Sequence, residues 1–575
     1  MNLKIVLGQI LVESGHPSVN VQKMKEMIAQ AKNDGADIIV FPQLCLSGYF
    51  VGDKWFASEF RNDLLAYNED IVACSDGIGV VWGNIFEQDG LVYDAGYYAY
   101  QQEVKYIQPK QSLQQHGIFN DGRYITTQAS NCAFVFEKDG KQHIIGIVVG
   151  DDLYSDTVMD RLVACDVILH IESKPWTLDD EHKKDERVKT LLPTIYSVNC
   201  AGMQNTGKNI VMYDGKSCVY EKGIRVCTLR DDFKEEYAVS DYFDHSKENK
   251  LLNCLVRSIQ EFDRQIMGYN PKWIIGLSGG LDSSISVALL SMALGSDRIC
   301  GYNLATKYNS QKTKDNAQNE ADALGVKIRN GYISEIHDAT TNTMKVYGYE
   351  DEDMPTLVHE NIQARIRGNV LSTFSQIENG IIINNGNKIE VALGYATLYG
   401  DSIGAMSPLG DLTKVQLFDL ARQINAHFNK EIIPERLLPT VTEDGLDWDM
   451  APSAELKDNQ YDPMKWFYHD WLISQLTDAK CNVEDIMQSY LDGSLLQSNM
   501  GRWLRYYHLD KPEAFIQDLE WVLRQMRIAI FKRIQMPPIV MVTNSAYGSN
   551  RSEIQGTFEP TRRYQQLKKD ILNMK

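Results

Sequence analysis

One segment of this 575-residue chain constrains its fold more than any other: KWIIGLSGGLDSSISVALLSMALG, residues 272–295. An apolar run typical of a buried strand leads into the loop SGGLDSS, residues 278–284, and a helix rich in Ala and Leu follows. This order brings backbone N–H groups and the positive end of a helix to one point, which is the context that a phosphate-binding loop requires. The segment therefore predicts an α/β domain with an anion site at the end of a strand.

Strands and helices continue to alternate after this loop. We expect a strand in RICGYNLATKYNS (298–310), a helix in KTKDNAQNEADALG (312–325) and a strand in GIIINNGNK (380–388). A helix at residues 251–268 opens this half of the chain. Such alternation is typical of a doubly wound parallel sheet with helices on both faces.

The first half of the chain has a different rhythm. Strands outnumber helices there, and several apolar runs look buried on both faces. These runs occupy residues 3–12, 36–44, 77–86, 143–150 and 165–172. An acidic and polar stretch at residues 231–250 separates the two halves, so we predict two domains, 1–245 and 251–575.

Charge and cysteine usage exclude several classes of protein. The formal net charge of −19 argues against nucleic acid as a main partner, because phosphate backbones are bound by basic surfaces. The 10 cysteines include no CxxC pair, which favours reduced thiols over a structural zinc site. No apolar run reaches the roughly 18 residues of a membrane span, and the N-terminus lacks the pattern of a signal peptide. We expect a cytoplasmic protein with no membrane partner.

The residues of the loop suit a nucleotide phosphate. Gly279 and Gly280 lack Cβ atoms, so that backbone N–H groups can approach an oxyanion closely, and Asp282 can hold Mg²⁺ against the phosphates. The expected phosphate-binding residues of the loop are Ser278, Gly279, Gly280, Asp282, Ser283 and Ser284. No lysine is present, so this is not a Walker A loop. The alternative is a ligand-free, glycine-rich turn with a serine at the helix N-cap.

At this loop the chain resembles the ATP pyrophosphatases, which cleave ATP between the α and β phosphates and adenylate a substrate. Five further segments narrow the resemblance to the NAD synthetase family, and they follow that family's order. They are ENIQARIRGNVLS (360–372), NNGNKIEVALGYATLYGD (384–401), PLGDLTKVQLFDLAR (408–422), PSAELKDNQYDP (452–463) and FKRIQMPPI (531–539). With the loop, they cover nearly all of residues 251–560.

The resemblance implies that ATP adenylates the carboxylate of nicotinic acid adenine dinucleotide, after which ammonia forms the amide of NAD and AMP leaves. A carboxylate is already ionised at neutral pH, so the first step needs neutralised phosphate charge and positioning rather than a general base. By the same resemblance, Asp282 and Lys414 are catalytic, Lys414 facing the ATP phosphates, and Asp282 and Glu390 are the Mg²⁺ ligands. The implied dinucleotide-binding residues are Arg365, Asn387, Lys388, Asp401 and Lys532. Two more cations, Arg367 and Arg533, are the easiest to explain as structural charges.

The first half resembles the nitrilase-type amidases, whose fold is an α-β-β-α sandwich. The segments that carry this likeness are GADIIVFPQLCLSGYF (35–50), YIQPKQSLQQHGIFNDGRY (106–124), GIVVGDDLYSD (146–156) and HIESKPW (170–176). In glutamine-dependent NAD synthetases this domain hydrolyses glutamine and passes ammonia on, using a Glu base, a Lys and a Cys nucleophile. Lys110 matches the Lys, but Gln43 stands in place of the Glu and Gly150 in place of the Cys.

These two replacements predict a vestigial glutaminase site. An amide cannot accept a thiol proton at neutral pH, and glycine has no side chain to form a covalent intermediate. We therefore expect ammonia, free or from a separate glutaminase, to be the nitrogen donor. Cys45 offers a weaker alternative as a displaced nucleophile, because it follows Gln43 by two residues and shares its face if the segment is an extended strand. Cys165 and Cys200 have less claim.

Two alternatives to this interpretation stay open. The first is another ATP-dependent amide ligase on the same scaffold, and the second is a nucleotide-binding assembly subunit without turnover. The intact SGGLDSS and NNGNKIE segments argue against the second. Retention of a catalytically inactive domain of about 240 residues indicates that it still buries an interface. We expect a homo-oligomer, at least a dimer and up to an octamer as in the glutamine-dependent relatives.

Overall fold

The computed structural model describes residues 3–179, 182–239, 250–306, 309–443, 445–450 and 463–574. The chain divides into two compact units, Met1–Gln265 and Ile266–Lys575. Helix α5 (Lys250–Phe262), which we expected at the start of the second domain, belongs to the first unit because it packs against β10 and β11. Its buried stripe, including Leu252, Leu255 and Ile259, requires such a cover.

The first unit contains two six-stranded sheets. One has the order β14-β1-β2-β3-β4-β5, and the other β13-β12-β9-β8-β7-β6. The bounds of the first are β1 Ile5–Gln9, β2 Ile38–Val40, β3 Gly79–Gln88, β4 Leu91–Tyr100, β5 Glu103–Pro109 and β14 Glu236–Val239. Those of the second are β6 Ala133–Lys138, β7 Lys141–Val149, β8 Val167–Ile171, β9 Thr194–Val198, β12 Cys218–Glu221 and β13 Ile224–Thr228. The strands β10 (Ala201–Asn205) and β11 (Asn209–Asp214) pair as an antiparallel hairpin.

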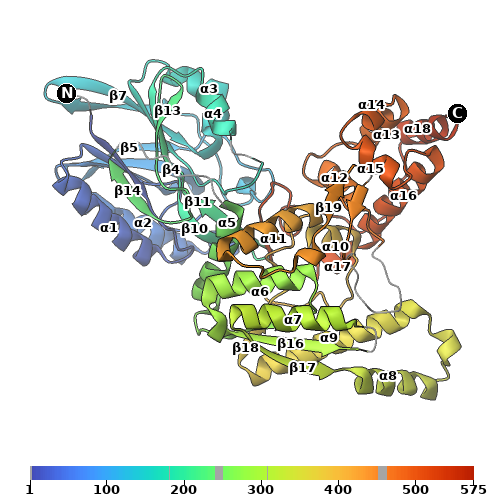
Figure 1. Cartoon of the computed structure of the whole chain (residues 1–575). Coiled ribbons are helices and arrows are strands. Elements are labelled where there is room, and N and C mark those ends of the chain that lie inside the picture. Colours follow the sequence, from blue (N-terminus) through green and yellow to red (C-terminus); the bar gives the residue numbers. More distant parts are fainter. Residues whose placement is uncertain are drawn as a thin grey trace. The chain divides into compact units, whose positions relative to one another are not determined.

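A shared apolar core joins the two sheets face to face. Ile5, Val40 and Tyr98 of one sheet pack with Ile147 and Leu169 of the other in a single buried cluster. The helices lie outside this pair of sheets: α1 (Pro17–Asn33) and α2 (Ser58–Ala73) cover the first sheet, and α3 (Asp156–Met159) and α4 (Lys183–Val188) cover the second. The unit is therefore the expected α-β-β-α sandwich (Figure 1).

The second unit is built on a four-stranded parallel sheet. Its order is β17-β16-β15-β18, and every neighbouring pair is parallel. The strands are β15 Lys272–Gly276, β16 Ile299–Ala305, β17 Lys327–Tyr332 and β18 Gly380–Ile382. Figure 1 shows α6 (Leu281–Leu294) and α7 (Gln311–Leu324) on one face and α9 (Thr356–Ile377) on the other. The chain thus forms the expected doubly wound fold.

The strand order reverses between β15 and β18, which is where doubly wound sheets bind ligands. From β15 the chain winds outward to β16 and β17, and it then returns to the other side of β15 as β18. The loop SGGLDSS follows β15, and the segment NNGNK follows β18. These two segments, about 100 residues apart in sequence, therefore meet at the carboxyl edge of the sheet.

The remainder of the second unit is mainly helical and has its own apolar core, which includes Trp466, Tyr490 and Phe515. Besides α8 (Ser334–Val346), the helices are α10 Lys388–Leu393, α11 Lys414–Phe428, α12 Tyr468–Thr477, α13 Val483–Leu491, α14 Ser494–Gln497, α15 Gly501–Tyr506, α16 Pro512–Ile528, α17 Ile530–Arg533 and α18 Arg562–Leu572. Three short strands complete it: β19 Thr440–Thr442, β20 Gly445–Asp447 and β21 Ile539–Val540. Among the described residues, no helix has both the length and the apolar composition needed to cross a bilayer.

Candidate active site

The loop after β15 has the backbone that an anion site requires. Helix α6 begins at Leu281 with Gly280 as its N-cap, so Asp282 and Ser283 stand in the first turn, at the positive end of the helix. Gly279 has φ +77°, and a Cβ at this position would lie 1.9 Å from the carbonyl oxygen of Thr313. Glycine is therefore required at residue 279 by conformation and by space.

The three serines of the loop do not share one role. Ser278 is exposed, and its Oγ lies 3.1 Å from the Oγ of Ser283, so these two hydroxyls stand together at the loop. Ser284 is fully buried, and its Oγ lies 2.8 Å from the Gly280 carbonyl oxygen, to which it donates, and 2.5 Å from Glu320. The Ser283 hydroxyl donates to the same carbonyl at 3.0 Å. At the fourth position of the helix the Ser284 hydroxyl turns back toward the N-cap carbonyl, so the phosphate contact expected of its side chain stays a prediction.

Asp282 is the meeting point of three elements. The Nζ of Lys414, at the start of α11, lies 2.9 and 2.8 Å from its two carboxylate oxygens. Asn387, the N-cap of α10, donates from Nδ2 to the same carboxylate at 3.2 Å. The Lys414 ammonium also lies 5.4 Å from the centre of the Trp466 ring. Three residues predicted from separate motifs thus form one polar cluster at the switch point of the sheet.

Glu390 lies on the other side of Asn387. The backbone N–H of Asn387 donates to its carboxylate at 3.2 Å, while the Asn387 side chain accepts from the N–H groups of Ile389 and Glu390. This capping box places the Glu390 carboxylate next to Asn387, the residue that contacts Asp282. Mg²⁺ commonly takes one or two protein carboxylates and completes its shell with phosphate and water oxygens, so Asp282 and Glu390 fit this ion. The described residues hold no group of three or more acidic, His or Cys side chains that binds a metal by itself.

Lys388 does not face this cluster. Its side chain is fully buried, and its Nζ lies 2.9 Å from Asp411, 2.6 Å from Asp478 and 3.1 Å from the hydroxyl of Thr543. Burial lowers the pKa of this lysine, but the two carboxylates more than compensate and raise it, so the ammonium stays charged. The first residue of α10 points into the protein while the N-cap points to the site, so the expected dinucleotide contact of Lys388 stays a prediction that this burial does not favour.

The other expected dinucleotide-binding residues gather at a second point of the same unit. Lys532 donates to the carbonyl oxygens of Gly394 and Ala396, both at 2.7 Å. Partial burial lowers the pKa of Lys532, the negative charge of Asp401 raises it, and the positive charge of Arg365 lowers it further. Arg365 itself is exposed on α9. These three charged groups are therefore close enough to interact electrostatically.

The two cations that we considered structural are anchored in the fold. Arg533 is buried, pairs with Glu553 at 2.8 Å and donates to the Ala392 carbonyl at 2.7 Å. Arg367 donates to the Leu304 carbonyl at 3.1 Å. Residues 452–462 of the segment PSAELKDNQYDP lie outside the described residues.

In the first unit, the three residues of the expected vestigial glutaminase site lie together. Gln43 donates to the carboxylate of Asp94 at 2.5 Å and accepts from the Ser173 N–H at 3.1 Å. The Nζ of Lys110 lies 3.8 Å from the same carboxylate and 2.8 Å from Asp121. Burial raises the pKa of Asp94 to about 7, although the Lys110 charge and the Gln43 bond act against the rise. Sequence reasoning missed both acids.

Gly150 stands directly against Gln43. It has φ +55°, and a Cβ at this residue would lie 2.8 Å from the Gln43 Oε1 and 3.0 Å from its Nε2. The Gln43 amide therefore occupies the space into which a side chain at residue 150 would point. The Gly150 carbonyl accepts from His170 Nε2 at 3.0 Å, and the other ring nitrogen of His170 contacts Ser197 at 2.9 Å.

None of the three cysteines that we considered as substitutes is placed as a reagent. Residues 43–47 form turns rather than an extended strand, so the face-sharing expected for Cys45 and Gln43 does not follow. Cys45 is fully buried between the Gly83 carbonyl (3.5 Å) and the Met24 sulfur (3.8 Å), and burial raises its thiol pKa. Burial likewise raises the pKa of Cys200 to about 12 and that of Cys165 to about 11. Thiols with raised pKa values are poor nucleophiles at neutral pH.

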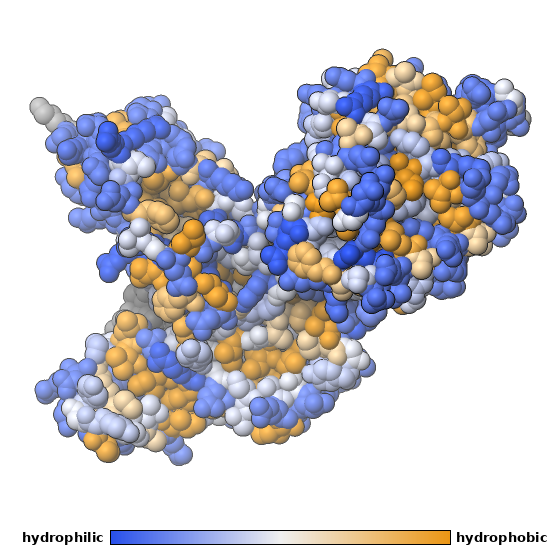
Figure 2. Space-filling model, turned by 180° about the vertical axis from the view of Figure 1, so that it is seen from behind, coloured by the Kyte–Doolittle hydropathy of each residue, from blue (hydrophilic) through white to orange (hydrophobic). Residues whose placement is uncertain are grey.

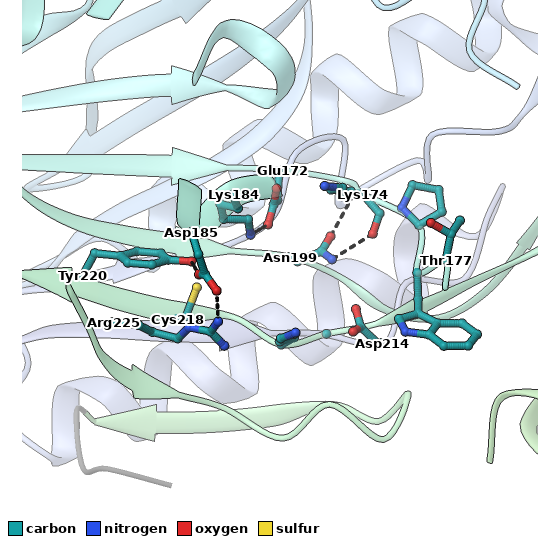
Figure 3. A pocket seen from close by; sticks show the side chains of 14 residues that line it. Glu172, Lys174, Thr177, Lys184, Asp185, Asn199, Asp214, Cys218, Tyr220 and Arg225 are labelled. Atoms are coloured by element: carbon teal, nitrogen blue, oxygen red, sulfur yellow. Dashed lines mark hydrogen bonds and ion pairs between the residues drawn. The ribbon is translucent and has the colours of Figure 1, made fainter. Parts of the chain in front are cut away.

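Two hollows accompany this unit. A cavity of about 520 Å³ has Leu44, Tyr49, Trp55, Asp121 and Tyr124 in its wall. Asp121 is also the ion-pair partner of Lys110, so the cavity reaches the expected vestigial glutaminase site. A smaller hollow of about 60 Å³ has two ion pairs among the side chains in its wall (Figure 3).

The pairs of the smaller hollow involve Lys184 with Glu172 and Arg225 with Asp185, while Asn199 bonds the backbone of Lys174 at 3.0 and 2.9 Å (Figure 3).

Comparison with known proteins agrees with the geometry. Residues 255–497 match the NAD synthase family model. The glutamine-dependent NAD(+) synthetase of Xylella fastidiosa is 26% identical over 575 residues, covering 96% of this chain and 97% of that protein. That of Acinetobacter baylyi is 27% identical over 481 residues, covering 80% of this chain and 85% of that protein.

Two solved structures share the fold along nearly the whole chain. The glutamine-dependent NAD+ synthetase of Acinetobacter baumannii, in complex with ADP, has a TM-score of 0.69 at 24% identity and covers 96% of this chain and 98% of that one. The enzyme of Cytophaga hutchinsonii has a TM-score of 0.75 at 16% identity, over 99% of this chain and 100% of that one. Residues 255–497 are thus similar to the NAD synthase family, and the chain is similar to the glutamine-dependent NAD(+) synthetases over almost its entire length.

Proposed function

We propose that this protein is an NAD synthetase that amidates nicotinic acid adenine dinucleotide at the expense of ATP, through an acyl-adenylate, with release of pyrophosphate and AMP. The observation that carries the proposal is the cluster of Asp282, Asn387 and Lys414 at the switch point of the parallel sheet. Three motifs far apart in sequence converge there beside a glycine-required loop. A decayed or purely structural domain has no need to keep this arrangement.

The arrangement suits phosphoryl chemistry. Lys414 and Asp282 neutralise each other, so neither charge is left unpaired in a partly buried place. When ATP arrives, Lys414 can exchange its carboxylate partner for a phosphate oxygen, and Asp282 becomes available to a cation. Bound Mg²⁺, held by Asp282 and Glu390, would supply charge neutralisation on the pyrophosphate that leaves. The loop N–H groups and the α6 terminus orient the phosphates for in-line attack.

We further propose that ammonia is the direct nitrogen donor. Gln43 is the acceptor and donor of two buried hydrogen bonds, and it faces a glycine. None of Cys45, Cys165 and Cys200 is placed to replace the nucleophile. The protein then depends on free ammonia or on a separate glutaminase, and the first unit serves the assembly of the protein.

Pyrophosphate release in the presence of ATP and the dinucleotide tests the synthetase proposal. Asp282→Ala and Glu390→Ala should abolish release, and Lys414→Ala should lower the rate about 10²- to 10³-fold, as expected for a preorganised charge at a developing anion. Lys388→Arg is the control for a general loss of folding, because it keeps a positive charge at a buried position that does not face the site. Near wild-type release by Asp282→Ala would refute the assignment.

NAD formation from ammonium salts and from glutamine tests the donor proposal. We expect turnover with ammonium and essentially none with glutamine, in protein freed of contaminating glutaminases. Only unprotonated ammonia carries the attacking lone pair, so at fixed, subsaturating ammonium the rate should rise between neutral and mildly alkaline pH. A glutamine-supported rate comparable with the ammonium rate, and lost in Cys45→Ser, would show a relocated nucleophile instead.

A further inference from the structure

Helix α7 forms a platform behind the phosphate loop. Thr313, Asn316 and Glu320 follow one another at spacings of three and four residues, so they lie on one face of the helix. All three are buried, and this face is directed at the loop. The Thr313 carbonyl closes the space beside Gly279, and Asn316 Nδ2 donates to the Gly279 carbonyl at 3.1 Å.

Glu320 extends the same support to the next residue of the loop. Its Oε1 is 2.5 Å from the Ser284 hydroxyl, which in turn lies 2.8 Å from the Gly280 carbonyl. Side chains of α7 thus hold two consecutive loop carbonyls, one directly and one through Ser284. The second carboxyl oxygen of Glu320 is buried and has no hydrogen-bond partner among the described residues. A carboxylate with one bare, buried oxygen is costly, so the contact calls for an explanation.

Few charges surround this carboxyl group. Arg436 is the cation that acts on it, and it is itself bound to Asn316 and to the Lys312 carbonyl. The elements that pack on α7 add little: α6 has Asp282 as its one charged residue, and β16 carries none, its titratable side chains being those of Cys300 and Tyr302.

On β17, the third element that packs on α7, Lys327 is exposed and Arg329 pairs with Glu378 at 2.8 Å.

We propose that Glu320 is a positioning residue that, through Ser284, sets the affinity of the loop for the phosphates of ATP, and that its ionisation lowers this affinity. The inference rests on the proposed nucleotide role of the loop. Glu320 lies outside every sequence segment that carries the resemblance to the NAD synthetase family.

The two protonation states of Glu320 differ in the hydrogen bonds and the charge that they place behind the phosphate loop. A neutral carboxyl group donates its proton to the Ser284 oxygen, and Ser284 then donates to Gly280, so each hydrogen in the chain is used. An ionised carboxylate instead accepts the hydrogen bond of the Ser284 hydroxyl, which then no longer donates to Gly280, and places a negative charge behind the helix terminus that receives the phosphates. Burial raises the pKa of Glu320 to about 8, the Ser284 bond and Arg436 acting against the rise, so both states are accessible near neutral pH.

The test compares Glu320→Gln, which is neutral at every pH and keeps a donor for Ser284, with the intact protein. Asp322→Asn is the matched control, because it removes one charge from an exposed position of the same helix. Between pH 7 and pH 9, at saturating ammonium and dinucleotide, the KM for ATP of the intact protein should rise about threefold to tenfold relative to Glu320→Gln, with kcat changing in parallel in both. Asp322→Asn should follow the intact protein.

A second measurement does not depend on turnover. The folded protein holds the Glu320 proton up to about pH 8, whereas a solvent-exposed glutamate in the unfolded chain releases it near 4.5. The free energy of unfolding of the intact protein should therefore fall between these pH values relative to that of Glu320→Gln. Titration of ATP alone into each protein should give the same pH trend in affinity as KM.

The outcomes separate the two proposals. Equal pH trends of KM and of ATP affinity in the intact protein and in Glu320→Gln would overturn the inference. Absence of ATP-dependent NAD formation in the intact protein, with ATP still bound in a Glu320-dependent way, would overturn the proposed function and leave the inference standing.

Discussion

At the scale of single residues, Gln43 and Gly150 are adapted to each other. The Gln43 amide donates to Asp94, accepts from Ser173 and fills the space beside Gly150. A glutamate at residue 43 would set a second carboxylate within hydrogen-bond distance of Asp94, and such a pair must share a proton to coexist. Gln43 and Gly150 therefore pack together without conflict. Reversing only one of them creates a conflict, with Asp94 for a glutamate at residue 43 and with Gln43 for a side chain at residue 150.

Gly150→Cys tests this packing. The new side chain must adopt φ +55° and meets the Gln43 amide at 2.8 Å, so we expect destabilisation by about 1–3 kcal/mol and no glutamine-dependent NAD formation. Gly150→Ala should cost a similar amount, because the conflict arises at Cβ and not at the thiol. Denaturant unfolding of both variants measures the cost. Stability equal to that of the intact protein would show that Gln43 moves away freely.

At the scale of elements, two neighbouring residues at the start of α10 have different roles. Asn387 caps the helix and contacts Asp282, while Lys388 turns inward to Asp411 and Asp478. Consecutive positions at a helix start lie about 100° apart, so they project to different sides. The motif carries both a site residue and a structural ion pair.

The two tasks of Asn387 can be separated by substitution. Asn387→Asp preserves the cap, because aspartate caps helices as well as asparagine does, but it sets a like charge against Asp282. We expect near wild-type stability with a large loss of ATP-dependent turnover. Asn387→Ala should lower stability by about 1 kcal/mol and also impair turnover. Paired measurements of unfolding and pyrophosphate release check both, and full activity of Asn387→Asp would contradict the Asp282 contact.

Lys388→Met tests the buried ion pairs of Lys388 with Asp411 and Asp478. Removing the ammonium leaves Asp411 and the partly buried Asp478 without their cation, and breaking a buried pair on one side costs about 3–5 kcal/mol. The loss should appear in the free energy of unfolding. If Lys388 binds the dinucleotide instead, the variant will fold normally and show a raised KM for that substrate.

At the scale of the whole molecule, the second unit exposes apolar side chains around α8. Val346 is 84% exposed, Tyr347 75% and Tyr332 74%, and Leu357 lies exposed nearby in sequence. Figure 2 shows apolar residues gathered at the lower left of the view, where the α8 end of this unit lies. Clustered exposed apolar groups mark interaction surfaces more often than isolated ones do. We propose that the protein assembles into a homo-oligomer in which such a surface is covered.

Light scattering at micromolar concentration tests the assembly. We expect at least a dimer for the intact protein, and a shift toward smaller species for Val346→Glu with Tyr347→Glu. The double change Asp351→Lys with Asp353→Lys, at polar positions nearby, controls for a general effect of added charge. A monomer at every concentration would refute the expected oligomer.

Part of this protein was determined by local sequence alone. The strand, the glycine-rich loop and the helix of residues 272–295 are short-range features, and Gly279 and the first turn of α6 lie where the pattern predicts. The alternation of elements also predicted the parallel sheet, because a right-handed crossover leaves few other arrangements. The family resemblance located Gln43 and Gly150 in the sequence, and residue type alone shows that an amide is no base at neutral pH and that glycine has no nucleophile.

Other features were decided only by tertiary structure. The direction of a side chain depends on the turn of its helix and on what packs there, so Lys388 and Ser284 point away from the site although their motifs lie in it. Cys45 failed as a partner of Gln43 because the backbone turns between them. Asp94 and Glu320 belong to no motif, and they gain importance only from burial beside a site residue, which changes their protonation. Sequence determined which chemical groups were present and which local turns formed, and the packing of distant segments decided which of those groups meet.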